Sequence, residues 1–206
     1  MVPRSVRGFK EYADAYRRVL DRIAIERGVR NWLEKTPEHL HYLDLIAETI
    51  PDARFIHIVR NGSNVVASLA RSVAEGPREW NWPVGDLDHY IKRWNFDVEI
   101  TLKAQANSRH HVVFYESLLG RPEEELRRVC DFLDLEFEQR MLDPRNSAEL
   151  VLGAAKREPW RRGVFDPLRT ETARVSEAQF PPEQQAFEQS GLLCGGDWRK
   201  LFGVES

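Results

Sequence analysis

The sequence predicts an α/β fold in which a parallel sheet is flanked by helices. The first observation is a short apolar run rich in β-branched residues, Phe55–Val59, which indicates a buried strand. The second is an Asn61-Gly62 turn signal directly after it, followed by a helical pattern. The third is a second strand-like run at 111–115, with a long helical pattern between the two runs. Strands that alternate with helices indicate a parallel sheet covered on both faces.

The composition is that of one globular domain, which we place over residues 1–206. The chain is 42% hydrophobic and 31% charged, and no apolar run is long enough to span a bilayer. A net charge of −3 argues against nucleic acid as the main partner. The two cysteines, Cys130 and Cys194, lack metal-ligand spacing, and the same holds for the histidines, so we expect no metal. With no secretory signal and no disulfide framework, we expect a cytoplasmic protein.

Three elements are expected before the Phe55–Val59 strand. Apolar residues recur at helical spacing from Tyr12 to Ile23, and Gly28 is placed to end that helix. Residues Val29 to Leu33 indicate a short strand. Residues 38–50 indicate a helix with Pro37 near its start.

The segment that follows the first strand has the features of an anion site. Ser63 is the expected N-cap of a helix that runs to about Arg71. Arg60 therefore lies at the carboxyl end of a strand and just before a helix N-terminus, the place where open α/β sheets bind ligands. The helix dipole and the backbone N–H groups favour an anion there, and the guanidinium of Arg60 is a planar set of donors suited to phosphate.

The rest of the chain alternates again, with a loop at 75–85, a helix over 88–107, the 111–115 strand and a helix over 123–133. A last helix is expected at 182–189. In the 88–107 helix the candidate buried positions are Tyr90, Ile91, Trp94, Val98 and Leu102. His57, inside the first strand, is expected to be a hydrogen-bonded interior group, and Cys130 a small core residue.

Three blocks, in order along the chain, resemble a known family. Arg60 with Ser68 eight residues later resembles the 3′-phosphate motif of sulfotransferases that use 3′-phosphoadenosine 5′-phosphosulfate (PAPS). Residues 32–39 (Trp-Leu-Glu-Lys-Thr-Pro-Glu-His) resemble the lysine-proline motif of bacterial and protein-tyrosine members. Residues 114–118 (Phe-Tyr-Glu-Ser-Leu) resemble the Tyr-Glu segment before a late family helix. The resemblance covers roughly residues 32–133.

The resemblance implies a P-loop NTPase-like sheet, PAPS as co-substrate, and transfer of a sulfuryl group to a hydroxyl or amine on a small molecule or peptide. It implies Lys35 as the catalytic cation that stabilises the leaving phosphate. It implies Arg60 and Ser68 at the 3′-phosphate and Tyr115 near the adenine. The residues alone also allow structural interpretations: a solvated Lys35 beside Glu34, an Arg60 salt bridge, a Ser68 hydroxyl bonded to its own helix, and a core-edge Tyr115.

Other site assignments stay open. Glu34 and His39 are the nearest titratable groups to Lys35 and are candidates for the base, a role that the resemblance does not assign. The loop residues 80–83 (Trp-Asn-Trp-Pro) are candidates to line the acceptor site. Residues 160–164 (Trp-Arg-Arg-Gly-Val) resemble a late basic family segment only faintly, and a solvated basic turn explains them as well.

The loop that cradles the 5′-phosphosulfate in the family has no counterpart that we can identify, and no Walker motif occurs. We therefore expect an N-terminally truncated chain with an incomplete sheet, little activity by itself, and self-association through exposed sheet edges. Two other functions remain open. One is a non-catalytic member that binds a nucleotide or a protein partner, and the other is a different P-loop-like kinase.

Overall fold

A computed structural model describes residues 8–75, 87–143 and Phe202. The chain divides into two compact units, residues 1–55 and 56–206, and the division falls at the first residue of the first strand. We describe each unit by itself. The expectation of a single domain over 1–206 stays a prediction.

The described part of the first unit contains a long helix, followed by a 3-10 helix and a short α-helix. Helix α1 (Phe9–Glu26) is followed by the 3-10 helix η1 (Pro37–Tyr42) and helix α2 (Leu43–Thr49). Gly28 ends α1 as predicted: its φ of 66° is in the left-handed region, and the Val29 amide donates to the Ala24 carbonyl at 3.0 Å. The helix predicted over 38–50 is present, but its first half is the 3-10 helix η1.

The prediction of a strand at Val29 to Leu33 is wrong, because residues 29–36 belong to no helix or strand. The side chains of Val29 and Leu33 are 50% and 79% exposed. A strand is stabilised by pairing with a neighbour, and the described part of the first unit, apart from the first residue of β1, contains no strand. The β-branched and apolar residues of this segment are therefore insufficient to form one.

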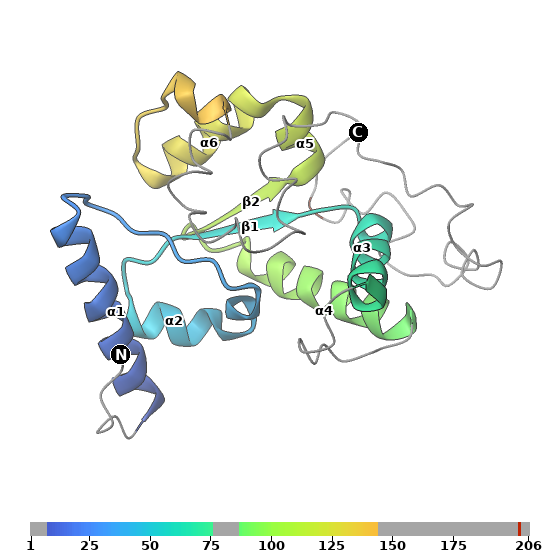
Figure 1. Cartoon of the computed structure of the whole chain (residues 1–206), viewed down its shortest axis with the longest axis horizontal. Coiled ribbons are helices and arrows are strands. Elements are labelled where there is room, and N and C mark those ends of the chain that lie inside the picture. The colour runs from blue at the N-terminus through green and yellow to red at the C-terminus, as the bar shows by residue number, and fades with distance from the viewer. Residues whose placement is uncertain (1–7, 76–86, 144–201, 203–206) are drawn as a thin grey trace. The chain divides into compact units, whose positions relative to one another are not determined.

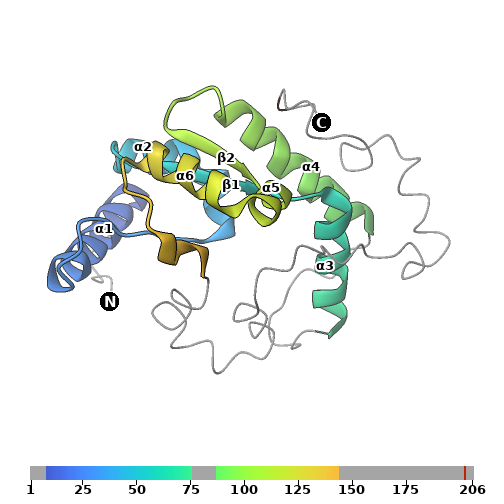
Figure 2. The same cartoon turned by 90° about the horizontal axis from the view of Figure 1, so that it is seen from above.

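The described part of the second unit is built around two strands and the helices that cover them. Its elements are β1 (Phe55–Val59), α3 (Gly62–Glu75), α4 (Leu87–Ala104), β2 (His110–Phe114), α5 (Tyr115–Gly120), α6 (Pro122–Leu133) and η3 (Gln139–Leu142). The strands pair in the order β1-β2 and run parallel, so the predicted α/β class is confirmed (Figure 1). Helix α4 lies on one face of this sheet, and α5 and α6 lie on the other (Figures 1 and 2).

Side chains of β2 alternate between the two faces as the period of a strand requires. Val112 and Phe114 pack on the core that α3 and α4 form with β1, while His111 stacks on Phe132 of α6 at 5.1 Å. The buried members of that core are Val59, Val66, Tyr90, Ile91, Trp94 and Val98. Four of the five buried positions predicted in the 88–107 helix are thus confirmed, and Leu102 is partly buried.

The remaining boundaries differ by a few residues. Strand β2 ends at Phe114, one residue earlier than predicted, so Tyr115 begins helix α5. The helix predicted over 123–133 begins at Pro122, which takes the first helical position that proline favours. Cys130 is buried and free, as expected. The predicted 182–189 helix, residues 160–164, Cys194 and most of the 75–85 loop, its Trp80–Pro83 segment included, lie outside the described residues. Among the described helices, none is long and apolar enough to cross a membrane.

Candidate functional site

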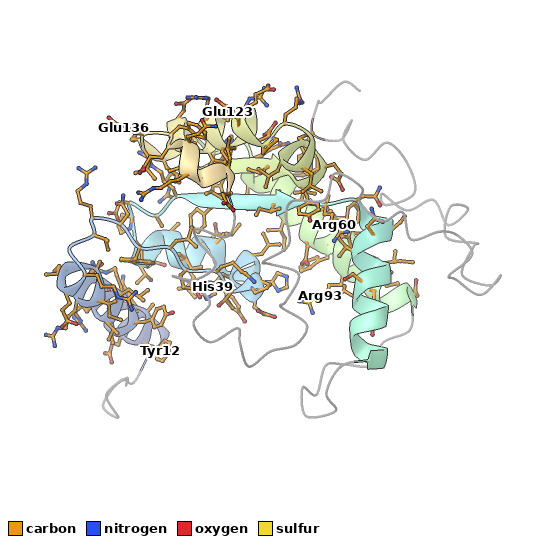
Figure 3. The ribbon with its side chains drawn as sticks, turned by 45° about the horizontal axis from the view of Figure 1, so that its top comes forward. Tyr12, His39, Arg60, Arg93, Glu123 and Glu136 are labelled. Carbon is orange, nitrogen blue, oxygen red and sulfur yellow. The ribbon has the colours of Figure 1, made fainter. Side chains whose placement is uncertain are left out.

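Arg60 lies where the sequence placed it, directly after β1 and before α3 (Figure 3). Its backbone is fixed from the core, because the indole Nε1 of Trp94 on α4 donates to the Arg60 carbonyl at 3.2 Å. The strand end is therefore held by a buried side chain from an element 34 residues away.

The first turn of α3 is capped by Asn61, not by Ser63 as predicted. The Asn61 side-chain oxygen accepts the Asn64 amide at 3.2 Å, and its carbonyl accepts the Val65 amide at 3.1 Å. These are the bonds of an N-cap residue, with Gly62 as the first helical position. Ser63 sits inside the helix because the Asn61 side chain already satisfies the first turn. The consequence is a helix N-terminus one residue from Arg60.

The structure brings two of the predicted site residues together. The guanidinium carbon of Arg60 lies 4.9 Å from the centroid of the Tyr115 ring, a cation–π contact. The Nε atom of Arg60 is buried and has no hydrogen-bond partner among the described residues. A buried donor without a partner carries a desolvation cost, so this guanidinium is suited to receive an anionic oxygen.

Glu116 takes part in the same arrangement and was not predicted. Its Oε1 accepts the Asn61 amide at 2.9 Å, which ties the start of α5 to the turn between β1 and α3. Two adjacent residues thus contact two other adjacent residues: Tyr115 contacts Arg60 through its ring, and Glu116 accepts a hydrogen bond from Asn61. We call Arg60, Asn61, Tyr115 and Glu116 the strand-end site. The only signal for Glu116 in the sequence is its place beside Tyr115 in the 114–118 block.

Ser68 lies six residues after the first residue of α3, and its side chain is exposed. At 1.5 Å per residue its Cα is about 9 Å along the helix from Gly62. Val66, two residues before it, is fully buried at 0% exposure, so Ser68 lies on the opposite side of the helix. Its role at the 3′-phosphate stays a prediction.

Lys35 lies in the first unit, in the irregular segment before η1, with an exposed side chain. The two candidate bases beside it are in contact with one another: His39 Nδ1 is 2.6 Å from Glu34 Oε2. Glu34 also accepts the Thr36 hydroxyl at 2.7 Å through Oε1. The structure thus places Lys35 next to a Glu34–His39 pair, and the base role of either residue stays open.

His57 is buried and hydrogen-bonded, as predicted. Its Nε2 is 2.9 Å from His110 Nδ1, and its Nδ1 is 3.3 Å from the hydroxyl of Thr101. That hydroxyl donates to the Asp97 carbonyl at 3.0 Å, so it accepts from His57 Nδ1–H, and His110 Nδ1–H donates to His57 Nε2. Burial and then the neighbouring His110 lower the pKa of His57 from 6.5 to about 4. His57 is a neutral interior link between β1, β2 and α4.

No group of three or more metal-binding side chains comes together within the described ranges. The chemistry that the strand-end site supports is the binding of an anion, because it combines a helix N-terminus, a guanidinium with a buried unpartnered Nε and an aromatic face. In the first unit, considered by itself, Lys35 has an exposed side chain.

Comparisons with known proteins agree with the motifs. A model of the sulfotransferase family matches residues 7–139, which is more than half of the chain. A candidate protein-tyrosine sulfotransferase of Caenorhabditis briggsae is 30% identical over 111 residues, covering 52% of this chain and 38% of the relative. The protein-tyrosine sulfotransferase of Drosophila melanogaster is 28% identical over 114 residues, covering 52% of this chain and 22% of the relative. The chain thus spans two fifths or less of these relatives.

The fold has a counterpart among solved structures. The sulfotransferase domain from the curacin biosynthetic pathway superposes with a TM-score of 0.54 at 21% identity. The superposition covers 62% of this chain and 47% of that domain. At this identity the similarity supports the fold alone.

Proposed function

The chain belongs to the sulfotransferase family, and we propose that it contributes to the transfer of a sulfuryl group from PAPS to a hydroxyl or amine acceptor. Sulfuryl transfer resembles phosphoryl transfer in its demands: the protein positions the donor and stabilises charge on its oxygens. Arg60 and Ser68 bind the 3′-phosphate in this proposal, Tyr115 borders the adenine, and Lys35 stabilises the leaving 5′-phosphate. No metal is required.

The strand-end site is the observation that supports the proposal most. Arg60 presents a buried Nε without a described partner, one residue before the N-terminus of α3. The ring of Tyr115 contacts this guanidinium at 4.9 Å, and a cation–π contact uses none of its N–H donors. A phosphate monoester matches these donors in charge and geometry, whereas a neutral ligand leaves the Nε desolvated and unpaired.

The acceptor class follows from the relatives. The names of two of them specify protein tyrosine, so a tyrosyl hydroxyl in a peptide is the first acceptor to test, with small phenols and amines beside it.

Self-association also belongs to the proposal. Ile58, the fourth residue of β1, is 63% exposed, and an exposed apolar side chain favours burial against another chain. A cytoplasmic location is also part of the proposal, and it is supported by the cysteine usage.

The experiment compares two nucleotides that differ only in the 3′-phosphate. In calorimetric titrations, Arg60→Ala is expected to weaken binding of 3′-phosphoadenosine 5′-phosphate by roughly 10- to 100-fold, because a charge-assisted hydrogen bond contributes about 1.5–3 kcal/mol. Binding of adenosine 5′-phosphate is expected to change little. Arg121→Ala, which removes the same charge from an exposed ion pair with Glu124, is the matched control. Equal losses for both nucleotides would mean that Arg60 has only a structural role.

A non-catalytic, nucleotide-binding member of the family is the second outcome that these titrations can reveal. Binding that depends on the 3′-phosphate, together with no transfer of labelled sulfate from PAPS to any acceptor of the panel, would favour it. Transfer well above background would favour the enzyme, and Lys35→Ala is then expected to lower turnover far more than nucleotide affinity.

A further inference from the structure

The turn that carries Lys35 is held on both sides by hydrogen bonds. Before it, the indole Nε1 of Trp32 donates to Asp21 Oδ1 on α1 at 2.9 Å. After it, the His39 amide donates to the Thr36 carbonyl at 3.0 Å, where η1 begins. Lys35 therefore lies between two fixed points, although its segment belongs to no regular element.

Both carboxylate oxygens of Glu34 face groups of this turn. Oε1 accepts the Thr36 hydroxyl at 2.7 Å, and Oε2 lies 2.6 Å from His39 Nδ1. This contact is short, but it lacks the geometry of a hydrogen bond. The side chain of Glu34 is only 20% exposed. The pKa of Tyr16 on α1 is raised, first by burial of the phenol and then by the negative charge of Glu34. The carboxylate thus faces Thr36, His39 and α1.

The consequence falls on Lys35. Its immediate neighbour is a carboxylate, yet its ammonium forms no ion pair or hydrogen bond with any residue that the structure describes. Of the two oxygens that could neutralise it, Oε1 accepts the Thr36 hydroxyl, and Oε2 is buried and faces His39 Nδ1. An ammonium that is in no ion pair has its attraction for an external anion unscreened by a neighbouring carboxylate.

We infer that Glu34 is a positioning residue for Lys35: by accepting Thr36 and contacting His39, it fixes the turn and keeps the lysine ammonium unpaired for an anionic oxygen. The inference rests on the proposed function, in which Lys35 meets the 5′-phosphate end of the nucleotide. It differs from the earlier alternative, in which Lys35 is an ordinary surface lysine beside Glu34.

The two interpretations predict opposite changes in anion affinity when the charge of Glu34 is removed. If Glu34 only neutralises Lys35, removing its negative charge strengthens anion binding by simple electrostatics. If Glu34 positions the turn, removing its charge and one acceptor loosens the turn, and anion binding weakens because the lysine must be ordered on binding.

The experiment follows the side-chain ammonium of Lys35 by NMR in the full chain with labelled lysine. The probes are 3′-phosphoadenosine 5′-phosphate and inorganic pyrophosphate. Glu34→Gln is expected to weaken the binding of each probe at Lys35 by roughly 3- to 10-fold, and Thr36→Val, which keeps the charge, by roughly 2- to 5-fold. Glu38→Gln, an equal change of charge on the same segment, is the control and is expected to leave binding unchanged or slightly stronger.

A second readout is specific to the contact with His39. In the wild-type chain the imidazole 15N shifts of neutral His39 are expected to show the Nδ1–H tautomer, and in Glu34→Gln a shift toward Nε2–H. Stronger binding in Glu34→Gln, or an unchanged tautomer, would overturn the inference, as would a wild-type Lys35 that responds to neither probe. A response to pyrophosphate but not to the nucleotide would contradict the proposed function, and the pyrophosphate titrations of the variants would still decide the role of Glu34.

Discussion

Arg60 and Asn61 of the strand-end site, like the Lys35 turn, lie outside regular elements, but different contacts hold the two regions. Arg60 and Asn61 are fixed by Trp94 and Glu116, which lie 34 and 55 residues away in sequence. The Lys35 turn is held by bonds within residues 34–39 and by one bond to α1, 11 residues away. Long-range contacts couple a site to the folding of the whole unit, whereas local bonds open at low cost.

The apolar residues of the two regions differ in the same way. In the second unit, Trp94 and Val66 are 5% and 0% exposed. In the first unit, α1 carries an apolar stripe at helical spacing whose members are 37–48% exposed, namely Tyr12, Tyr16, Val19 and Ile23. The stabilisation from apolar burial is therefore concentrated in the second unit. The strand-end site is rigid because it is bonded to buried or distant residues of that unit, Trp94 and Glu116.

The largest expected effect tests this contrast directly. Trp94→Ala removes a core side chain and the donor to the Arg60 carbonyl, and we expect a loss of about 3–5 kcal/mol in the free energy of unfolding. Tyr16→Ala, on the exposed stripe, is expected to cost about 1 kcal/mol or less. Urea unfolding of both variants measures the difference. Equal losses would mean that α1 is as well packed as the core.

The second test uses the acid sensitivity of the second unit. The pKa of His57 is about 4 when folded and near 6.5 when unfolded, so its contribution to stability is full above pH 6.5 and is lost as the pH falls toward 4. The loss is expected to reach about 3 kcal/mol, from 1.36 kcal/mol per pKa unit. Unfolding curves at pH 7, 5.5 and 4.5 measure it.

His57→Gln is the control for this pH dependence, because it removes the titrating ring from its place between His110 and Thr101. Its stability is expected to vary less over the same range. A variant with the same slope as the wild type would assign the acid sensitivity to other groups, of which His111, whose pKa burial also lowers, is the next candidate.

The smallest expected effect concerns the start of α3. Asn61→Ala removes the N-cap bond to the Asn64 amide and is expected to cost about 1 kcal/mol. Ser63→Ala, at the position that the sequence favoured, is expected to cost less. Paired unfolding measurements decide between them, and a larger loss for Ser63→Ala would restore Ser63 as the cap.

The sequence by itself determined the elements whose signals are local. The strand Phe55–Val59, the glycine stop after α1 and the buried face of α4 follow from patterns within a few residues. The motifs around Lys35 and Arg60 also identified the family without any structure. Side-chain periodicity and turn chemistry act over one or two turns of chain, so these features can be predicted from the sequence.

Only the tertiary structure decided the rest. Residues 29–33 have the composition of a strand but form none, because a strand also needs a partner. The choice of Asn61 over Ser63 as cap, the contact of Arg60 with Tyr115 and the bond from Asn61 to Glu116 depend on how the ends of β1 and β2 meet. Those ends are more than fifty residues apart in sequence, and parallel pairing alone brings them to the same edge of the sheet.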